Sequence, residues 1–332
     1  MGRIQNPAVL TGVLSGVIAN LIWGLAFVIP VILPASEGVE LALGRYLFFG
    51  VISLCIVVFT RGAGIRGLDR KVWLTALAFA FAGHLGYYFF LVEGVNHVGS
   101  PVTTVIIGTL PVTVAVSGNL IRREFPFSRL LLPLAAIAAG LVLVNLAEFD
   151  WRDVGHGHSG LTWVIGIGSA LVALILWTCY AVANSRFLRN HPEISSYNWS
   201  TLMGVGTLAL SLIAVPVAGV SGGIHIKAST IVPLLFGCLV LGVLVSWVGT
   251  VLWNRSSGLV PISIAGQLTV VEIIAGLIYV FAWNRRIPSP MEIAGIVLLI
   301  GGVLLAIQRT RSSPAAEVEA EAQLASEAKL TS

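Results

Sequence analysis

Two charged residues inside apolar segments carry the strongest chemical signals in this sequence. Glu272 stands within the apolar run 260–282, and Arg45 stands within the run 39–59. An ionisable group in the hydrocarbon region of a bilayer costs about 2.5–3.5 kcal/mol on insertion scales, so it usually faces a cavity or a partner. A carboxyl group removed from water holds a proton more readily, which makes Glu272 the candidate for proton coupling. Arg45 is the candidate contact for an anionic group of a substrate.

Both residues also have purely structural explanations. Glu272 would be stable in a hydrogen bond between helices or paired with Arg45. The long side chain of Arg45 would equally reach the outer interface.

Aromatic and polar residues at helical spacing suggest a binding cavity. Tyr87 and Tyr88 follow His84 by three and four residues, so all three share one helix face. An imidazole and two phenols suit a polar or aromatic metabolite, although a His bonded to a backbone carbonyl would give the same pattern.

Two further helix faces are expected to line the same cavity. Asn20, Trp23 and Phe27 share a face of the first apolar run, and Trp177, Tyr180 and Asn184 share a face of the sixth. Packing against lipid or neighbouring helices is the alternative for the tryptophans.

The elements that position these residues are predicted from hydropathy. Of the 332 residues, 57% are hydrophobic and 10% are charged, and the mean hydropathy is +0.94. This composition excludes an ordinary soluble domain and a disordered chain. Since about 20 apolar residues cross a bilayer, the sequence predicts an all-α integral membrane protein with ten transmembrane helices. Their expected limits are 11–33, 39–59, 72–92, 101–120, 129–147, 161–183, 198–217, 231–253, 260–282 and 291–308.

The ten spans divide into two similar halves. Trp23 of the first span corresponds to Trp177 of the sixth, and Pro101 at the start of the fourth corresponds to Pro261 at the start of the ninth. Five spans per half place the second copy in the opposite orientation, so we expect two inverted five-helix repeats at 11–147 and 161–308. Spans one, three, four, six, eight and nine are expected to line the path.

Several motifs resemble one transporter family. They are the run Asn-Leu-Ile-Trp-Gly at 20–24, the run Gly-Arg-Tyr-Leu at 44–47 and the turn at 123–126 with Glu124. Together with the five-plus-five arrangement, they resemble the EamA-type members of the drug/metabolite transporter superfamily. The resemblance implies a secondary carrier, commonly an exporter of small metabolites or amino acids. The chain departs from the family pattern at Arg286, where an acidic residue is usual, and at Glu272.

The distribution of Lys and Arg predicts the orientation. With a cytoplasmic amino terminus, thirteen of these residues lie on the inside and four on the outside, so both termini (1–10 and 309–332) are expected in the cytoplasm of a cell with a plasma, or inner, membrane. The inside set is Arg3, Arg61, Arg66, Arg70, Lys71, Arg122, Arg123, Arg129, Arg186, Arg189, Arg255, Arg309 and Arg311. The tail is acidic and is expected to be disordered.

Other chemical signals are weak. The outside loop 148–160 contains Asp150, Asp153, His156 and His158, which we interpret as a solvated connector and not as a metal site. The Gly-x-Ser-Gly at 219–222 lacks a base on a later span, and no nucleotide-binding motif is present. We therefore expect no cofactor, no metal and no nucleic-acid partner.

These observations predict a secondary transporter, and not an enzyme, that moves a small-molecule substrate through the lipid bilayer by alternating access. Proton coupling and export are part of this expectation. Two alternatives stay open: an integral-membrane enzyme acting on a lipid or peptide, and a membrane scaffold without transport.

Overall fold

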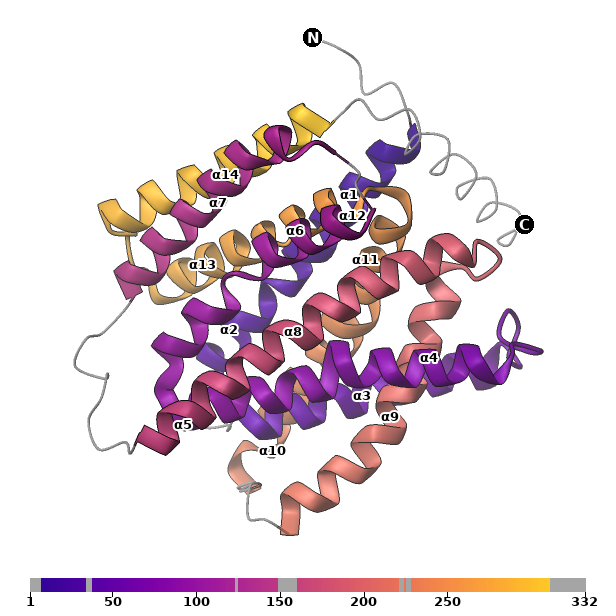
Figure 1. The fold of residues 1–332 in the computed structure, drawn as a ribbon. Helices are drawn as coiled ribbons and strands as arrows, with labels where there is room; N and C mark the ends of the chain where they lie inside the picture. Colours follow the sequence, from indigo (N-terminus) through magenta and orange to yellow (C-terminus); the bar gives the residue numbers. More distant parts are fainter. Residues whose placement is uncertain are drawn as a thin grey trace.

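The computed structural model describes residues 7–33, 38–122, 125–148, 160–220, 224 and 228–310. Over these ranges the chain is helical without β-strands, and ten helices are long and apolar enough to cross a membrane. This confirms the predicted all-α membrane protein with ten spans (Figure 1). The described ranges do not include Glu124, the loop at 149–159 with its Asp and His residues, Ser221 and Gly222 of the Gly-x-Ser-Gly segment, or the tail from residue 311.

The first five spans are built from seven α-helices and one π-helical segment. These are α1 (Pro7–Trp23), α2 (Leu25–Ile32), α3 (Gly38–Phe59), α4 (Arg70–Ala80), η1 (Phe81–Leu85), α5 (Gly86–Ile107), α6 (Leu110–Arg122) and α7 (Phe127–Glu148).

The second five spans follow the same plan after the loop. These are α8 (Gly160–Asn190), α9 (Ser196–Val220), η3 (Ala228–Thr230), α10 (Ile231–Leu239), η4 (Val240–Val248), α11 (Gly249–Leu259), α12 (Ile262–Leu268), α13 (Val270–Asn284) and α14 (Pro290–Thr310).

Helix irregularities recur at matching places in the two halves. The third span contains the π-helical segment η1, and the eighth contains η4. The fourth span is interrupted at Thr109 and the ninth at Thr269, and both hydroxyls donate to a carbonyl three residues earlier, at 2.7 and 2.6 Å. A non-helical residue, Gly99 or Val260, stands just before each of these two spans. Because π-helical turns and helix breaks leave backbone groups available to other partners, they mark where side chains can dock.

The packing between spans also follows matched pairs. The fifth span lies along the tenth (α7 and α14), the fourth along the ninth (α6 and α12), and the second along the seventh (α3 and α9). Helix α5 of the third span lies along α8 of the sixth, just as α1 of the first lies along α11 of the eighth (Figure 1). The ten spans therefore form one bundle in which neither half packs by itself.

Three spans are longer than hydropathy predicts. The third runs from Arg70 to Gly99, the sixth from Gly160 to Asn190 and the eighth from Ala228 to Leu259. The sixth and eighth continue through polar residues, among them Asn184 and Asn254, which are fully buried. Their hydrogen bonds inside the bundle replace those to water, so the helices do not have to end there. The first span is already helical at Pro7, the first described residue, four residues before the predicted limit.

The departure from the family pattern at Arg286 has a structural explanation. The guanidinium of Arg286 donates to Glu292 at 2.7 Å, and Glu292 is fully buried at the start of α14. The same carboxylate accepts the backbone N–H of Ser289 at 2.6 Å, which caps the helix. The acidic group at this connection therefore comes from a different position in the chain.

Candidate functional site

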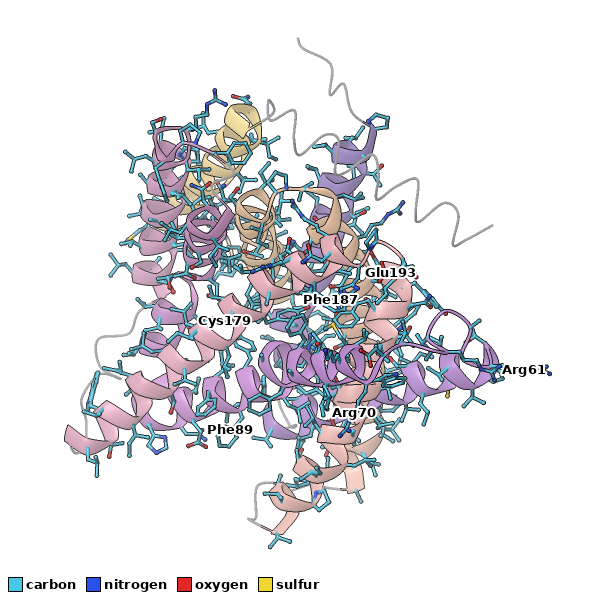
Figure 2. The ribbon with its side chains drawn as sticks, turned by 45° about the vertical axis from the view of Figure 1, so that its right-hand side comes forward. Arg61, Arg70, Phe89, Cys179, Phe187 and Glu193 are labelled. Carbon is cyan, nitrogen blue, oxygen red and sulfur yellow. The ribbon has the colours of Figure 1, made fainter. Side chains whose placement is uncertain are left out.

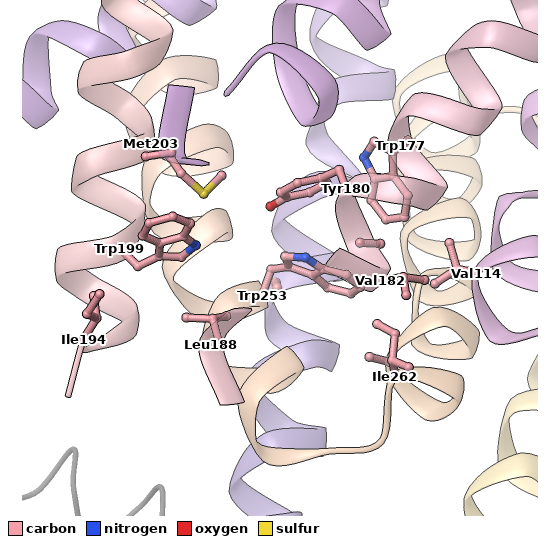
Figure 3. Packing of buried hydrophobic residues seen from close by; sticks show 14 of the residues in the cluster. Val114, Trp177, Tyr180, Val182, Leu188, Ile194, Trp199, Met203, Trp253 and Ile262 are labelled. Atoms are coloured by element: carbon pink, nitrogen blue, oxygen red, sulfur yellow. The ribbon is translucent and has the colours of Figure 1, made fainter. Parts of the chain in front are cut away.

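An aromatic cluster lies at the centre of the bundle, where the first, sixth and eighth spans meet. We use this term for Trp23, Trp177, Tyr180 and Trp253. The ring of Trp23 lies 6.5 Å from that of Trp177 and 5.4 Å from that of Trp253, and the Trp177 and Trp253 rings are 5.7 Å apart. Figure 3 shows Trp177, Tyr180 and Trp253 grouped together. Trp23 and Trp177, predicted to be counterparts in the two halves, thus lie close together, and Trp253 contacts both.

Glycines allow this close approach. A Cβ atom at Gly249 would overlap the indole of Trp23, and one at Gly83 would lie 2.8 Å from the ring of Tyr180. Side chains larger than hydrogen at these two positions would displace the rings.

His84 lies in the π-helical segment η1 and is surrounded by rings. Its imidazole is 5.3 Å from Phe49, 5.9 Å from Tyr46 and 6.1 Å from Tyr180, centre to centre. The Nε2 atom of His84 is buried and has no hydrogen-bond partner among the described residues. The backbone carbonyl of His84 accepts a hydrogen bond from the Tyr46 hydroxyl at 3.3 Å. The imidazole therefore presents an unused polar atom in an apolar setting, where such atoms are costly.

Two of the predicted site residues, Trp23 and Arg45, donate hydrogen bonds to the other π-helical segment, η4. The indole N–H of Trp23 donates to the carbonyl of Val245 at 3.0 Å. The Nε–H of Arg45 donates to the hydroxyl of Ser246, the next residue, at 2.6 Å. The guanidinium carbon of Arg45 lies 5.5 Å from the centre of the Tyr46 ring. Arg45 is thus anchored within the bundle on one edge of its guanidinium.

Arg45, from the first half of the chain, and Glu272, from the second half, lie in the same region of the bundle. Their charges are close enough to interact, and Glu272 likewise interacts with Tyr87. Neither the Glu272 side chain nor the two terminal nitrogens of Arg45 make a hydrogen bond or ion pair with any described residue. Both side chains are half-buried. The two structural explanations for Glu272, a hydrogen bond between helices and a direct pair with Arg45, are therefore not realised.

A second group of polar residues lies nearer the side of the bundle on which α1 begins and α14 ends, here called the terminal side. We use "buried amide network" for Asn184, Trp199, Ser200 and Asn254, all fully buried. The Asn184 amide donates to Asn254 at 2.8 Å and accepts from the Trp199 indole at 2.7 Å. The Asn254 amide donates to the hydroxyl of Ser200 at 2.7 Å. This network joins α8, α9 and α11.

Packed aromatic rings also lie on the terminal side, next to the buried amide network. The ring of Phe187 is stacked on that of Trp199 with centres 4.1 Å apart, and Phe79 meets both edge-on. Figure 3 shows Trp199 at the left and Trp177 at the right, with Tyr180 and Trp253 drawn between them. The aromatic cluster is therefore separated from the terminal side by packed rings and the buried amide network.

The structure gathers most of the residues predicted from sequence. Tyr88 lies 6.2 Å from Tyr46, centre to centre, and Tyr87 packs against the core that contains Trp177 and Tyr180. Asn20 is fully buried, and its amide donates to the carbonyl of Gly16 in its own helix at 2.7 Å. Phe27 is 48% exposed, so it does not belong with the buried rings.

Sequence reasoning missed four residues of this region and one of its spans. Tyr46 and Phe49 come from the second span, and Ser246 and Trp253 come from the eighth. Tyr46 stands in the Gly-Arg-Tyr-Leu run and directly follows Arg45, so that motif was the available signal. Ser246 had no distinguishing signal, because its role depends on the π-helical turn. The described residues include no group of three or more His, Cys, Asp or Glu side chains placed to hold a metal.

Comparison with known proteins gives a consistent assignment. Residues 10–146 match the model of the EamA-like transporter family. The chain is 37% identical over 326 residues to the inner membrane protein YtfF of Escherichia coli (strain K12), covering 94% of this chain and 100% of that protein. A solved structure described only as "Crystal structure of protein" superposes with a TM-score of 0.72 at 16% identity, covering 90% of this chain and 97% of that one. This last similarity shows the fold alone.

Proposed function

Because the chain belongs to the EamA-like transporter family of the drug/metabolite transporter superfamily, we propose that it is a secondary carrier for a small metabolite, preferably an amino acid. It is a multi-pass membrane transporter, and its relative YtfF is an inner membrane protein. The substrate, the coupling ion and the direction are the parts that we propose.

The observation that carries the proposal is the pair of half-buried charges at Arg45 and Glu272. Their charges interact without a direct contact, and each has hydrogen-bonding atoms without a partner among the described residues. A zwitterion with a carboxylate and an amine complements both charges at once. The adjacent rings of Tyr46 and Tyr88 favour a molecule with some apolar surface.

Glu272 is the proposed site of proton coupling. A carboxylate without a hydrogen-bond donor in a low-dielectric setting is stabilised either by a proton or by a cationic substrate group. Competition between the two for the same oxygens would couple proton movement to substrate movement. Protonation also removes the attraction to Arg45, which biases one of two conformations.

Alternating access between two inverted repeats is the proposed mechanism. The recurring π-helical segments and the matched packing of spans support a pseudo-two-fold relation between residues 11–147 and 161–308. The buried amide network and its neighbouring rings support a conformation closed on the terminal side. The opposite conformation would break this network and close the side near Arg45.

We propose that the terminal side faces the cytoplasm and that transport is outward. Thirteen Lys and Arg residues flank the spans on that side and four on the other, and such residues are enriched on the cytoplasmic face. Export is favoured by the resemblance to the family alone.

Radiolabelled counterflow in proteoliposomes tests the carrier and the substrate class together. We expect saturable exchange with an amino-acid pool and none with pooled amines or dicarboxylates, which match only one of the two charges. Arg45→Gln should raise KM by roughly 10- to 100-fold, as expected for loss of a charge-assisted bond. Arg129→Gln is the matched control, because Arg129 is an exposed cation at the start of α7.

Each other result has a defined meaning. Exchange with amines or dicarboxylates, but not amino acids, overturns the substrate class and keeps the carrier. No exchange with any pool through folded protein contradicts the carrier and returns the enzyme and scaffold alternatives. An equal effect of Arg129→Gln removes Arg45 from the site.

A further inference from the structure

A pocket lies away from the aromatic cluster, at the turn between α3 and α4 on the terminal side. Its volume is about 600 Å³, and its lining includes Val57, Val58, Arg61, Arg66 and Trp73. Figure 2 shows Arg61 at the outer tip of this turn. Nothing in the proposed transport function uses these residues.

The local structure places two arginines at the mouth of the pocket. Helix α3 ends with the Gly62 N–H bonded to the Val57 carbonyl at 2.8 Å and the Arg61 N–H bonded to the Val58 carbonyl at 3.1 Å. This is a Schellman motif, whose left-handed position usually holds glycine but here holds Arg61, with φ +52°. The Arg66 N–H then bonds the Gly62 carbonyl at 3.0 Å, which folds the chain back toward Arg61.

These arginines have no anionic partner within the described chain. The side chains of Arg61 and Arg66 make no hydrogen bond or ion pair with any described residue. The segment 60–71 carries Arg61, Arg66, Arg70 and Lys71 but only one acidic residue, Asp69. The pocket therefore has a net positive charge.

The end of α13 shows how the chain neutralises such a turn elsewhere. Arg285 occupies the same left-handed position, with φ +51°, and the following Arg286 N–H bonds the Phe281 carbonyl at 3.0 Å. There the guanidinium of Arg286 pairs with the buried Glu292 at 2.7 Å. The α3–α4 turn repeats this backbone geometry with Gly62 in the place of Arg286, and no described carboxylate pairs with its arginines.

The pocket walls favour a lipid over a free anion. Val58 is 65% exposed and Phe59 is 86% exposed, at the end of a membrane span where acyl chains are the solvent. Trp73 also lines the pocket, and tryptophan is enriched where membrane meets water. Arginine binds phosphate oxygens in a planar, bidentate manner. We propose that the pocket binds the phosphate of an anionic phospholipid, with Arg61 and Arg66 on the headgroup and Val57, Val58 and Trp73 against its acyl region.

Native mass spectrometry of the full chain, purified in detergent with phosphatidylglycerol or phosphatidylcholine, tests this proposal. We expect retained phosphatidylglycerol to exceed phosphatidylcholine, and the excess to disappear in the double variant Arg61→Gly, Arg66→Gln. Since each basic residue near an anionic lipid contributes about fivefold in binding, the loss should be on the order of tenfold or more. Glycine suits the left-handed position, so this variant keeps the turn. The matched control is Arg70→Gln, Lys71→Gln, which removes two charges beside the pocket.

Four outcomes overturn the proposal, the last of them in a single variant. The first is equal retention of the two lipids by wild type, and the second is equal loss in the control, which indicates diffuse surface charge. The third is displacement of the lipid by inorganic phosphate at millimolar concentration, which identifies a free-anion site. The single variant Arg66→Gln, which leaves the left-handed residue untouched, should show a partial loss, and wild-type retention in this variant assigns the lipid elsewhere.

Discussion

The bundle contains two polar regions that differ in whether their hydrogen bonds are completed within the chain. In the buried amide network, Asn184, Trp199, Ser200 and Asn254 satisfy one another across three helices. Around Arg45, Glu272 and His84, polar atoms stay without partners among the described residues. Both regions lie within membrane spans, where unsatisfied polar groups are expensive.

This difference separates polar groups that stabilise the fold from polar groups that are candidates for a role in function. A satisfied network stabilises one packing of its helices and needs nothing from outside. An ionisable group without a partner inside a span is a candidate for binding another molecule, such as a substrate, a proton or water, during function. The predictions below test whether the two regions separate in this way.

The largest effect is expected for Glu272→Gln on proton-driven accumulation. One coupled proton supplies 1.36 kcal/mol per pH unit, so a one-unit gradient should drive about tenfold accumulation in wild type. The variant cannot release a proton, so accumulation should fall to about one while exchange without a gradient continues. Proteoliposome uptake with and without a pH gradient measures this. Glu93→Gln, a partly exposed carboxylate near the far end of the third span, is the control.

Unchanged gradient dependence in Glu272→Gln would move proton coupling to another group. The contrast between the two regions would then rest on Arg45 and His84 alone.

The next effect is expected for Asn254→Ala within the buried amide network. The substitution leaves the Asn184 amide and the Ser200 hydroxyl without one partner each, at a cost of about 1–3 kcal/mol. Thermal unfolding in detergent should show the loss. Ser211→Ala is the control, because its hydroxyl bonds only to Thr207 of its own helix at 2.8 Å. Equal melting temperatures of Asn254→Ala and Ser211→Ala would show that the network does not hold the closed side.

His84→Phe, unlike Asn254→Ala, is expected not to lower the stability of the protein. The change keeps a ring against Phe49 and Tyr180 but removes the buried Nε2 atom that lacks a described partner. We expect an unchanged or higher melting temperature together with a KM raised roughly two- to tenfold, the value of one hydrogen bond. A fall in melting temperature comparable to that of Asn254→Ala would place His84 among the structural residues.

The smallest effect is expected for Trp23→Phe, at the boundary between the regions. It removes the bond to the Val245 carbonyl while keeping an aromatic ring beside Trp177 and Trp253. The loss of stability should be about 0.5–1.5 kcal/mol, measured by thermal unfolding. Trp177→Phe is the comparison, since no side-chain hydrogen bond of Trp177 to a described residue would be lost. A larger loss in Trp177→Phe would mean that ring packing outweighs the bond to η4.

Much of the fold could be predicted from local composition. A span is recognised from about 20 consecutive residues, so all ten were placed, and limits erred mainly where buried polar residues continue a helix, as at Asn184 and Asn254. Arg45, His84, Trp23 and Glu272 stood out because polar and indole groups within apolar runs are rare. Ser246 and the π-helical turns could not be predicted, because they depend on which side chain of another span docks there.

The sequence by itself determined that this chain is a ten-span membrane protein, which spans it has and which few residues are costly within them. The free energy of transferring a segment from water to lipid is nearly a sum of contributions from its residues, so it can be estimated from the sequence alone. Only the tertiary structure decided that Asn184 is satisfied and Glu272 is not, that the second span contributes Tyr46 and Phe49, and that Arg286 has a carboxylate while Arg61 has none. Each of these depends on a hydrogen bond or contact between residues far apart in sequence, and such pairings follow from how the helices pack.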